Sequence, residues 1–424
     1  MRVLVVGAGG REHALAWKIA RSPGVERVLA APGSDGIARE ATCFAEVSAG
    51  DAAGLAALAR REGADLVVIG PEEPLANGVA DRLREAGLAV FGPSRAAARL
   101  EGSKAFARAF MARHGIPHPR FEVCRDREAA RHAVRARDGR CVVKADGLAA
   151  GKGVVVAASV EAAEAALDEM MGRRRFGAAG DAVVVEDVLV GQEASYYALS
   201  DGEQVATLAA AQDHKRALDG DGGENTGGMG AYSPTPLVTP PVEKRILEEI
   251  VHPTFAGLRR EGMPYRGVLY VGLMIDAAGA PAVVEFNVRF GDPETQALVL
   301  GMEGDLVPLL DGAARGRLES GASAMKGAAV CVVLASAGYP RASDAGKPIA
   351  GIEAAEADPD VVVFHAGTRR EGGHFVTAGG RVLGVTARGS DVAAARARAY
   401  AAVDRIGFDG RQWRRDIAAR ALGA

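Results

Sequence analysis

The sequence contains few cysteines and no long apolar run, and both shortages narrow the class of protein. Four cysteines occur in 424 residues, far apart and without a Cys-x-x-Cys pair: Cys43, Cys124, Cys141 and Cys331. Isolated cysteines of this kind indicate reduced thiols, partly in the core. No run approaches the ~18 apolar residues of a membrane helix, and the first residues enter a strand without a signal peptide. We therefore expect a cytoplasmic protein with no membrane partner.

Positive charge is not in excess either. Arginine and lysine together number 51 against 54 acidic residues, so the net charge of −3 provides no basic face for nucleic acid. The eight histidines show no His-Glu-x-x-His spacing, so a histidine-bound zinc site is not expected. Only 8 of the basic residues are lysines, and four of these stand in or beside glycine-containing motifs: Lys104, Lys144, Lys152 and Lys215.

Residues 1–101 alternate short apolar runs with amphipathic stretches, which is typical of an open parallel sheet flanked by helices. A glycine-rich turn follows the first strand, but Glu12 replaces the third glycine of a dinucleotide fingerprint. The second strand closes with Pro32-Gly33 instead of an acidic residue, which disfavours NAD. The turn can still hold a phosphate on its N–H groups. Glu72 follows another buried strand, at the edge where open α/β sheets bind ligands.

Two β-branched runs surround residues 144–153, a stretch with three glycines and two lysines. Glycines let backbone N–H groups approach an anion, and the lysine ammonium groups add point charges, so this stretch indicates a phosphate-binding flap. An ordinary solvated hairpin is the alternative. Ser103 is placed to cap a helix whose first residue, Lys104, opposes the helix dipole unless an anion lies nearby.

A third candidate site lies on a strand near residue 285. Strand alternation places Glu285 and Asn287 on one face, and Arg289 continues it. Carboxylate and amide oxygens suit a hard cation, and Mg2+ prefers a few such ligands together with substrate phosphates. A solvated strand face is the alternative. Residues 212–234 form a polar, glycine-rich segment that favours a binding loop over a disordered one.

The pattern changes at residue 325 to short β runs and a helix over 391–406, with Gly379-Gly380 as a hairpin turn. No catalytic constellation stands out in this part. We therefore assign residues 325–424 a packing or lid-like role.

Six motifs together resemble the ATP-grasp superfamily and, within it, the family of phosphoribosylamine-glycine ligases, over nearly the entire chain. The motifs are Gly7-Ala-Gly-Gly-Arg-Glu-His13, Leu100-Glu-Gly-Ser-Lys104, residues 144–153, Gln212-Asp-His-Lys-Arg216, residues 225–234 and residues 285–295. The resemblance implies a mixed α/β and α+β protein. Its parts are an N-terminal α/β substrate-binding domain (1–101), an ATP-grasp domain (102–322) with a mobile flap subdomain (about 120–190), and a small, mostly β C-terminal domain (325–424).

The resemblance also implies an activity. ATP, glycine and 5-phosphoribosylamine would give glycinamide ribonucleotide, ADP and phosphate through a glycyl phosphate, in de novo purine synthesis. ATP and Mg2+ or Mn2+ are the implied cofactors, the two small molecules are the implied partners, and a monomer is expected.

The family pattern assigns roles to individual residues. Implied ATP-binding residues are Lys104 and Lys144 at the phosphates, Lys152 on the flap, Glu186 and Val188 at adenine, and Glu193 at the ribose. Implied metal ligands are Glu285 and Asn287, and implied catalytic residues are Lys152 and Arg289. Implied substrate-binding residues are Gly9, Gly10, Pro32, Gly33, Glu72, Asp213, Arg289 and Asp292.

Two other interpretations fit parts of the sequence. A carboxylating ATP-grasp ligase of purine or biotin metabolism would share the ATP site but not the acceptor. A nucleotide-binding regulatory protein without turnover would leave the cluster of Glu285, Asn287 and Arg289 unexplained. Many ATP-grasp enzymes carry another acidic ligand on the preceding strand, whereas residues 268–275 contain none, so the number of metal ions stays open.

Overall fold

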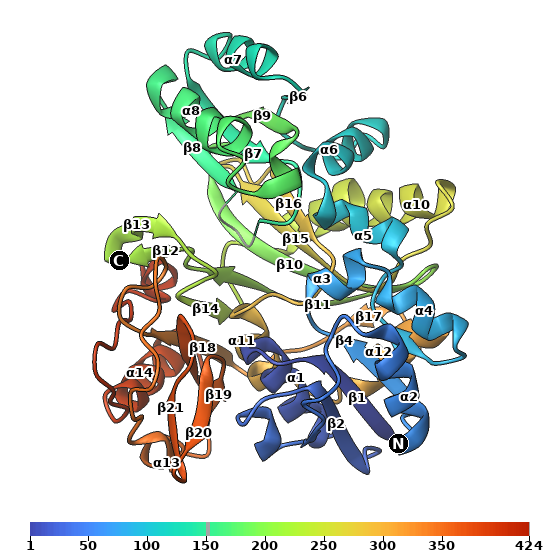
Figure 1. Cartoon of the computed structure of the whole chain (residues 1–424), viewed down its shortest axis with the longest axis vertical. Coiled ribbons are helices and arrows are strands. Elements are labelled where there is room, and N and C mark those ends of the chain that lie inside the picture. Colours follow the sequence, from blue (N-terminus) through green and yellow to red (C-terminus); the bar gives the residue numbers. More distant parts are fainter. Residues whose placement is uncertain (150–152, 424) are drawn as a thin grey trace.

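The computed structural model describes residues 1–149 and 153–423. Figure 1 shows a blue N-terminal part beside a red C-terminal part, with a small cyan and green lobe at the other end of the molecule. Lys152, predicted on the flap, lies outside the described residues. All four cysteines carry free thiols, as predicted. Nowhere in the described ranges is a helix long and apolar enough to cross a membrane.

The N-terminal part is a five-stranded parallel sheet covered by helices. Its strands are β1 (Arg2–Gly7), β2 (Arg27–Pro32), β3 (Thr42–Cys43), β4 (Leu66–Ile69) and β5 (Val90–Phe91). Its helices are α1 (Gly10–Ala20), the short η1 (Ile37–Arg39), α2 (Ala52–Glu62), α3 (Glu72–Ala76), α4 (Val79–Glu85) and α5 (Arg95–Gly102). The strand order is β3-β2-β1-β4-β5, and residues 3–6 are buried, as a sheet covered on both faces requires. The predicted open parallel sheet is confirmed.

Three predicted substrate-binding turns meet at one edge of this sheet. β2, β1 and β4 are neighbours, so the turns that follow their carboxyl ends lie side by side. Gly33, with φ of 70°, donates its N–H to the carbonyl of Gly7 at 3.1 Å, which joins the first two turns. The third turn leads into α3, whose first residue is Glu72. Ligands of open α/β sheets bind at such an edge.

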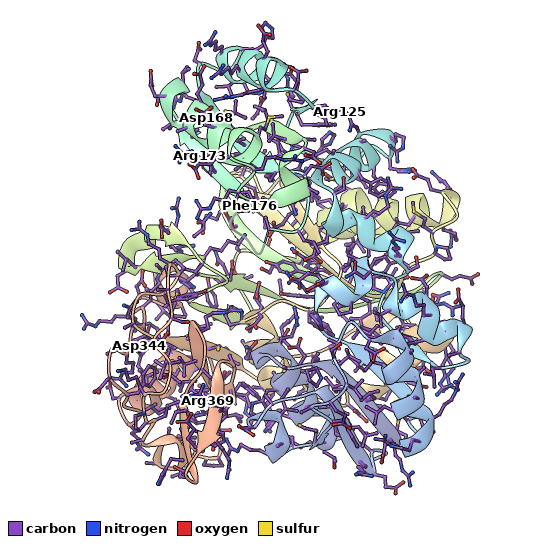
Figure 2. All side chains as sticks on the ribbon, viewed as in Figure 1. Arg125, Asp168, Arg173, Phe176, Asp344 and Arg369 are labelled. Carbon is purple, nitrogen blue, oxygen red and sulfur yellow. The ribbon has the colours of Figure 1, made fainter. Side chains whose placement is uncertain are left out.

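The small lobe is a four-stranded antiparallel sheet in the order β6-β9-β7-β8, preceded by α6 (Lys104–Arg113). Its elements are β6 (Phe121–Cys124), α7 (Arg127–Arg135), β7 (Arg140–Ala145), β8 (Val154–Ala158), α8 (Val160–Leu167), η2 (Asp168–Gly172), η3 (Gly177–Gly180) and β9 (Val183–Asp187). The predicted pair of strands around the flap is confirmed, with Lys144 opposite Val154. The lobe has its own hydrophobic core. Figure 2 labels Arg125, Asp168, Arg173 and Phe176 there, well away from Asp344 and Arg369 in the C-terminal part.

A nine-stranded sheet forms the middle of the molecule and continues into the C-terminal part. Its strands are β10 (Gln192–Asp201), β11 (Val205–Asp213), β14 (Gly230–Ser233), β15 (Arg266–Ile275), β16 (Pro281–Asn287), β17 (Gly321–Ala322), β18 (Ala328–Ala335), β19 (Val361–His365) and β22 (Arg381–Gly389). The order is β16-β15-β10-β11-β14-β18-β22-β19, with β17 beside β11. β14 therefore joins the strands before and after residue 325 into one sheet.

Helices and two small hairpins complete the fold. The helices are α9 (Pro240–Arg245), η5 (Ile246–Val251), α10 (His252–Arg260), α11 (Glu294–Gly301), α12 (Val307–Arg315), α13 (Ile352–Ala355), α14 (Val392–Val403) and η6 (Ala419–Leu422). Leu4 of β1 shares one hydrophobic core with Leu269 and Phe286 of the central sheet, so these two parts pack as one body.

Two local predictions were wrong. Residues 212–234 are not a single loop, because β12 (Arg216–Leu218) and β13 (Gly222–Asn225) form a hairpin around η4 (Asp219–Asp221), and β14 enters the large sheet. Gly379-Gly380 is not a hairpin turn, because β21 (His374–Thr377) pairs with β20 (Thr368–Glu371) while β22 pairs with β18 and β19. β14 and β22 pair with strands distant in sequence, and these pairings prevailed over the local turn signals. The hairpin of β12 and β13 is local, but its glycine-rich, polar composition is also that of a loop.

Candidate functional site

Arg108, Lys144 and Glu186 form a group that we call the buried cation cluster. Arg108 donates to both carboxylate oxygens of Glu186, at 2.6 Å from Nε and 2.8 Å from Nη2, and Lys144 Nζ lies 2.9 Å from Oε2. At most 5% of each side chain is exposed. Burial would raise the pKa of Glu186, but Lys144 and Arg108 hold it below its usual value. Burial also lowers the pKa of the Lys144 ammonium, against the opposing effect of Glu186.

A β-bulge fastens the central sheet to this cluster. The register of β15 and β16 shifts at one point, which leaves Val284 outside the ladder. Its free carbonyl accepts from Lys144 Nζ at 2.9 Å and from Arg108 Nη2 at 2.7 Å. The strand that carries the predicted metal ligands is therefore held against the small lobe.

Lys104 and its neighbours connect α6 to the start of the flap. Ser103 caps α6, as predicted, by accepting the Phe106 N–H at 3.0 Å, and its hydroxyl donates to Asp146 Oδ1 at 2.8 Å. Lys104 Nζ donates to the carbonyl of Gly147 at 3.1 Å. The predicted phosphate-binding lysine thus lies beside the first residues of the flap. Asp146 was not predicted, although it belongs to the flap motif.

Glu285 and Asn287 face the same side of β16, as predicted. Burial would raise the pKa of Glu285, but Lys215 and two further lysines lower it to about 2, so this carboxylate is an anion at neutral pH. Lys215 Nζ lies 3.8 Å from Glu285 Oε1 and 2.8 Å from Glu193 Oε2. The Glu285 carboxylate is one-third exposed, and the amide oxygen of Asn287 lies beside it. Such a pair of oxygen ligands fits a hard cation such as Mg2+ or Mn2+.

Asp213 lies at the end of β11 among acidic groups. Burial raises its pKa to about 8 against the opposing effect of Lys215, and Glu294 adds to the rise. Glu294 begins α11 and is itself buried, with its carboxylate accepting from the Ser195 hydroxyl at 3.2 Å. No role was predicted for Glu294, because nothing except its place in the motif of residues 285–295 distinguished it in the sequence.

Arg289 lies between the predicted metal ligands and the N-terminal turns. Its guanidinium is 3.1 Å from Glu72 Oε2, 3.0 Å from Glu101 Oε1 and 3.3 Å from Asn287 Oδ1. Glu101 in turn accepts the Val288 N–H at 2.8 Å. The flanking carboxylates of Glu101 and Glu72 raise the pKa of Arg289 further despite its burial. Glu72 and Arg289, predicted as substrate-binding residues from segments far apart in sequence, are brought together.

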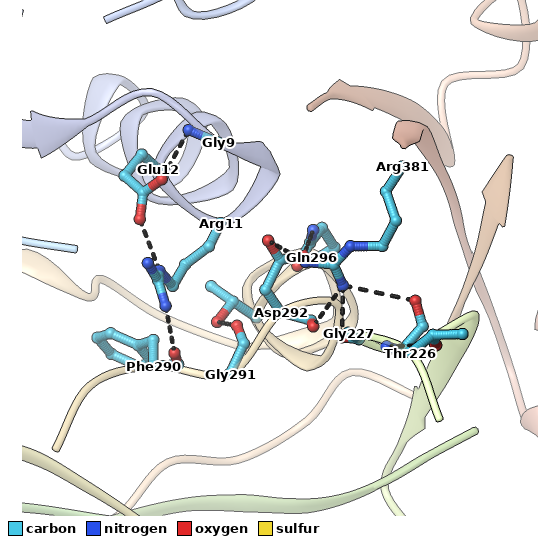
Figure 3. Close-up of polar contacts among 12 residues, drawn as sticks. Gly9, Arg11, Glu12, Thr226, Gly227, Phe290, Gly291, Asp292, Gln296 and Arg381 are labelled. Carbon is cyan, nitrogen blue, oxygen red and sulfur yellow. Dashed lines mark hydrogen bonds and ion pairs between the residues drawn. The ribbon is translucent and has the colours of Figure 1, made fainter. Parts of the chain in front are cut away.

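Arg11, Asp292 and Arg381 mark a second group, which we call the domain junction (Figure 3). Arg11 donates from Nη1 to the carbonyl of Phe290 at 3.1 Å, and its Nε lies 2.6 Å from Glu12 Oε1. Arg381 Nη2 lies 3.1 Å from Asp292 Oδ2. Burial would raise the pKa of Asp292, but Arg381 and Arg11 hold it below its usual value. Neither arginine was predicted.

The turn before α1 is shaped by Glu12. This carboxylate accepts the Gly9 N–H at 2.7 Å, so that N–H is used within the chain. A Cβ at Gly7 or at Gly70 would lie 2.5 Å or 2.2 Å from a Glu12 atom, so both positions leave room for this side chain. Glu12 stands where a dinucleotide fingerprint has its third glycine, and its side chain fills the space inside the turn and binds the Gly9 N–H.

The remaining predicted residues lie apart from one another. Val188, at 41% exposed, follows β9, and Pro32 follows a cis peptide bond at the edge of the N-terminal sheet. Asp213 and Asp292 have different neighbours, because the first lies near Lys215 and the second pairs with Arg381.

Family models match three successive segments. The N domain of phosphoribosylglycinamide synthetase matches residues 1–101, its ATP-grasp (A) domain matches 102–295, and its C domain matches 329–420. The phosphoribosylamine-glycine ligase of Allochromatium vinosum is 51% identical over 424 residues, with 100% of this chain and 99% of the relative covered. That of Ralstonia nicotianae is 50% identical, with 100% of both chains covered.

Solved structures also match nearly the whole chain. The crystal structure of the phosphoribosylamine-glycine ligase from Thermotoga maritima matches with a TM-score of 0.87 and 36% identity, and covers 99% of this chain and 100% of that one. Biotin carboxylase from Campylobacter jejuni shares the fold, with a TM-score of 0.73 at 14% identity over 97% of this chain and 92% of that chain.

Proposed function

The chain belongs to the phosphoribosylglycinamide synthetase family, and we propose that it joins glycine to 5-phosphoribosylamine at the expense of ATP. The products are glycinamide ribonucleotide, ADP and phosphate, as in de novo purine biosynthesis. The proposed route has two steps. The glycine carboxylate attacks the γ-phosphorus of ATP and releases ADP, and the amine of phosphoribosylamine then attacks the glycyl phosphate carbonyl and releases phosphate.

The buried cation cluster supports the ATP end of this proposal. We assign Lys144 and Lys104 to the phosphates, Glu186 and Val188 to the adenine segment, and Glu193 to the ribose. Lys144 lies near the end of β7, where the predicted flap begins, and Lys104, at the N-terminus of α6, lies beside the first residues of the same flap. Positive charge and the helix dipole both favour anions there. Lys152, predicted on the flap itself, is proposed to cover the phosphates when the flap closes and to exclude water.

Glu285 and Asn287 are the proposed ligands of Mg2+ or Mn2+. A divalent cation there would neutralise charge on the triphosphate while the nucleophile approaches. The low pKa of Glu285 supports this role, because a ligand carboxylate must be ionised.

The position of Arg289 is the observation on which the proposal rests. It contacts Asn287 of the proposed metal pair on one side and Glu72 of the substrate turns on the other. A fixed guanidinium at this point would stabilise negative charge on the transferring phosphoryl group and on the acyl phosphate. It would also orient the two substrates toward each other.

The substrate end is proposed to lie at the edge of the N-terminal sheet. We assign the phosphoribosyl group to the turns with Gly9, Gly10, Pro32, Gly33 and Glu72. Asp213 and Asp292 are assigned to the glycine amine, which carries positive charge at neutral pH. Asp292 is the anion of the two, whereas Asp213, whose pKa burial raises to about 8, would keep its proton until that positive charge binds beside it. An anionic Asp292 near Gly10 would lie at the boundary between the two substrates.

ADP release tests the proposed function. The full-length protein is incubated with ATP, Mg2+, glycine and freshly generated phosphoribosylamine, and each component is omitted in turn. We expect ADP and glycinamide ribonucleotide in equal amounts only with all components present. ADP release that depends on bicarbonate but not on glycine would contradict the proposal and indicate a carboxylating ligase.

A further inference from the structure

Arg381 begins β22 in the C-terminal part, but its side chain ends among residues of the central part (Figure 3). Its Nη1 donates to the carbonyl of Gly227 at 2.5 Å and to the carbonyl of Asp292 at 2.7 Å, while Nη2 pairs with the Asp292 carboxylate at 3.1 Å. One guanidinium therefore joins the glycine-rich segment between β13 and β14 to the turn after β16. Arg381 is 21% exposed and Asp292 19%, so solvent screens the pair far less than a surface pair.

The glycine-rich segment packs directly on that turn. Gly228 has φ of 108°, and a Cβ there would lie 2.4 Å from Pro293 Cδ, so both its conformation and its space require glycine. A second group from the C-terminal part holds the same segment, because the Gly227 N–H donates to the Tyr339 hydroxyl at 3.1 Å. The C-terminal part thus binds both the N–H and the carbonyl of Gly227.

The N-terminal turn meets the same point. A Cβ at Gly10 would lie 3.0 Å from Gln296 Nε2, 3.3 Å from Ala366 Cβ and 3.8 Å from Asp292 Oδ1. Gln296 Nε2 donates to Asp292 Oδ1 at 2.8 Å. One oxygen of Asp292 is therefore held by Gln296 and the other by Arg381, which leaves this carboxylate one orientation beside Gly10.

We infer that Arg381 is a positioning residue for the substrate end of the site, and that it acts through Asp292 and the Gly227–Gly228 segment. The inference rests on the proposed function, which puts glycine and phosphoribosylamine at this end. Arg381 has its donors turned to the chain itself, so it orders groups that face the substrates. The C-terminal part accordingly has a specific task in the reaction, in addition to packing. Small displacements of positioning groups lower catalysis strongly, which is why this contact has a measurable effect.

The test uses Arg381→Ala and Arg381→Lys in the full-length protein. KM is measured for ATP, glycine and phosphoribosylamine, together with kcat and Tm. For Arg381→Ala we expect KM for glycine and for phosphoribosylamine to rise about tenfold or more, as for loss of a charged hydrogen bond, while KM for ATP changes less than about twofold. Arg381→Lys keeps the pairing with Asp292 but cannot also reach the carbonyls, so it should restore part of the loss.

Arg388→Ala is the matched control. Arg388 lies on the same strand, and its guanidinium pairs with Asp360 at 2.5 Å inside the C-terminal part. Loss of that pair should lower Tm without changing any KM. Equal KM changes in Arg388→Ala and Arg381→Ala would overturn the inference, and so would a rise in KM for ATP that matches the other two. If Arg381→Ala does not fold, the same comparison is made on Arg381→Lys.

A double variant tests whether Arg381 acts through Asp292. The KM values of Arg381→Ala combined with Asp292→Asn should not exceed those of the worse single variant, whereas fully multiplied effects would contradict the inference. A wild-type protein without glycine-dependent turnover would overturn the proposed function and with it this inference. An active wild type with unchanged KM values in Arg381→Ala would overturn the inference alone.

Discussion

The buried cation cluster and the domain junction both pair charged side chains that are largely shielded from solvent, but they take these side chains from different parts of the chain. In the cluster, Arg108, Lys144 and Glu186 come from elements of one region, between residues 104 and 187, and at most 5% of each side chain is exposed. In the junction, Arg11, Asp292 and Arg381 come from three parts of the chain. The cluster lies at the proposed ATP end, and the junction lies at the proposed substrate end.

This difference in composition and burial indicates which group contributes mainly to folding stability and which mainly to the alignment of substrates. A buried ion pair that loses one partner leaves an uncompensated charge, so a change in the cluster should act mainly on folding. In the junction, Arg381 and Asp292 are 21% and 19% exposed and connect the Gly227–Gly228 segment to the turn after β16, so a change there should act mainly on the alignment of substrates. Elements of one region hold the proposed ATP-binding group, whereas the groups proposed to contact the substrates depend on assembly of the whole chain.

The largest expected effect is on the cluster. Arg108→Met should lower the free energy of unfolding by about 3 kcal/mol, because Glu186 stays buried and loses one of the two cations of the cluster. Urea unfolding measures this change. The control is Arg113→Met on the same helix, whose pair with Glu261 is 48% and 26% exposed and should contribute less than about 1 kcal/mol. Equal destabilisation by the two variants would remove the distinction between the cluster and an ordinary surface pair.

The next largest effect is expected on turnover when a proposed metal ligand is changed. Glu285→Gln should lower turnover about 100-fold and shift the Mg2+ dependence to higher concentration, since the ionised ligand is lost and the shape is kept. Activity is measured over a Mg2+ titration, with Tm as the check on folding. Wild-type activity at limiting Mg2+ would rule out Glu285 as a ligand.

A smaller effect is expected at the junction. Arg11→Met removes the donor to the Phe290 carbonyl and should raise KM for phosphoribosylamine about thirtyfold, or about 2 kcal/mol, with KM for ATP unchanged. Arg21→Met at the end of the same helix is the control, because Arg21 is 48% exposed and pairs with Glu40 on the surface. If KM for ATP rises as much as KM for phosphoribosylamine, the proposed division between the two ends is wrong.

The smallest effect concerns pH and the contact between α1 and the C-terminal part. His13 Nδ1 accepts the His365 N–H at 2.8 Å, and burial, with Arg39 nearby, lowers the pKa of His13 to about 3. The unfolded chain binds a proton at His13 below pH ~6.5 and the folded chain does not, so stability is lost as pH falls, by about 1.4 kcal/mol per pH unit for each such histidine.

His13→Asn should make this loss shallower, because asparagine can still accept the His365 N–H but binds no proton. Free energies of unfolding at pH 7.5, 6.5 and 5.5 measure the slope. The exposed His374 provides the control variant, His374→Asn, which should leave the slope unchanged. A His13→Asn slope equal to that of the wild type would show that protonation of His13 does not loosen this contact.

Sequence patterns predicted much of the fold because hydrophobic periodicity is local. The parallel N-terminal sheet, the cap at Ser103 and the strand pair around the flap all follow from residues within one or two elements. The common face of Glu285 and Asn287 likewise needs only strand alternation. The hairpin within residues 212–234 was missed because its polar and glycine-rich composition is also that of a loop.

Arg108, Glu101, Arg11 and Arg381 could not be assigned from their neighbours in sequence. Arginine is frequent in this chain, and nothing local distinguishes Arg381 from Arg388 on the same strand. Their different roles depend on what each side chain meets, since Arg381 reaches Asp292 and Arg388 reaches Asp360.

The sequence by itself determined the element types, the family resemblance and the chemical character of the site, because these depend on side-chain chemistry at short spacing. The tertiary structure alone decided that Glu186 pairs with Arg108, that the Glu12 side chain packs against Gly70 and that the C-terminal part reaches the proposed substrate end. Such contacts join residues tens to hundreds of positions apart. Burial also sets their pKa values and strength, and burial exists only once the chain has folded.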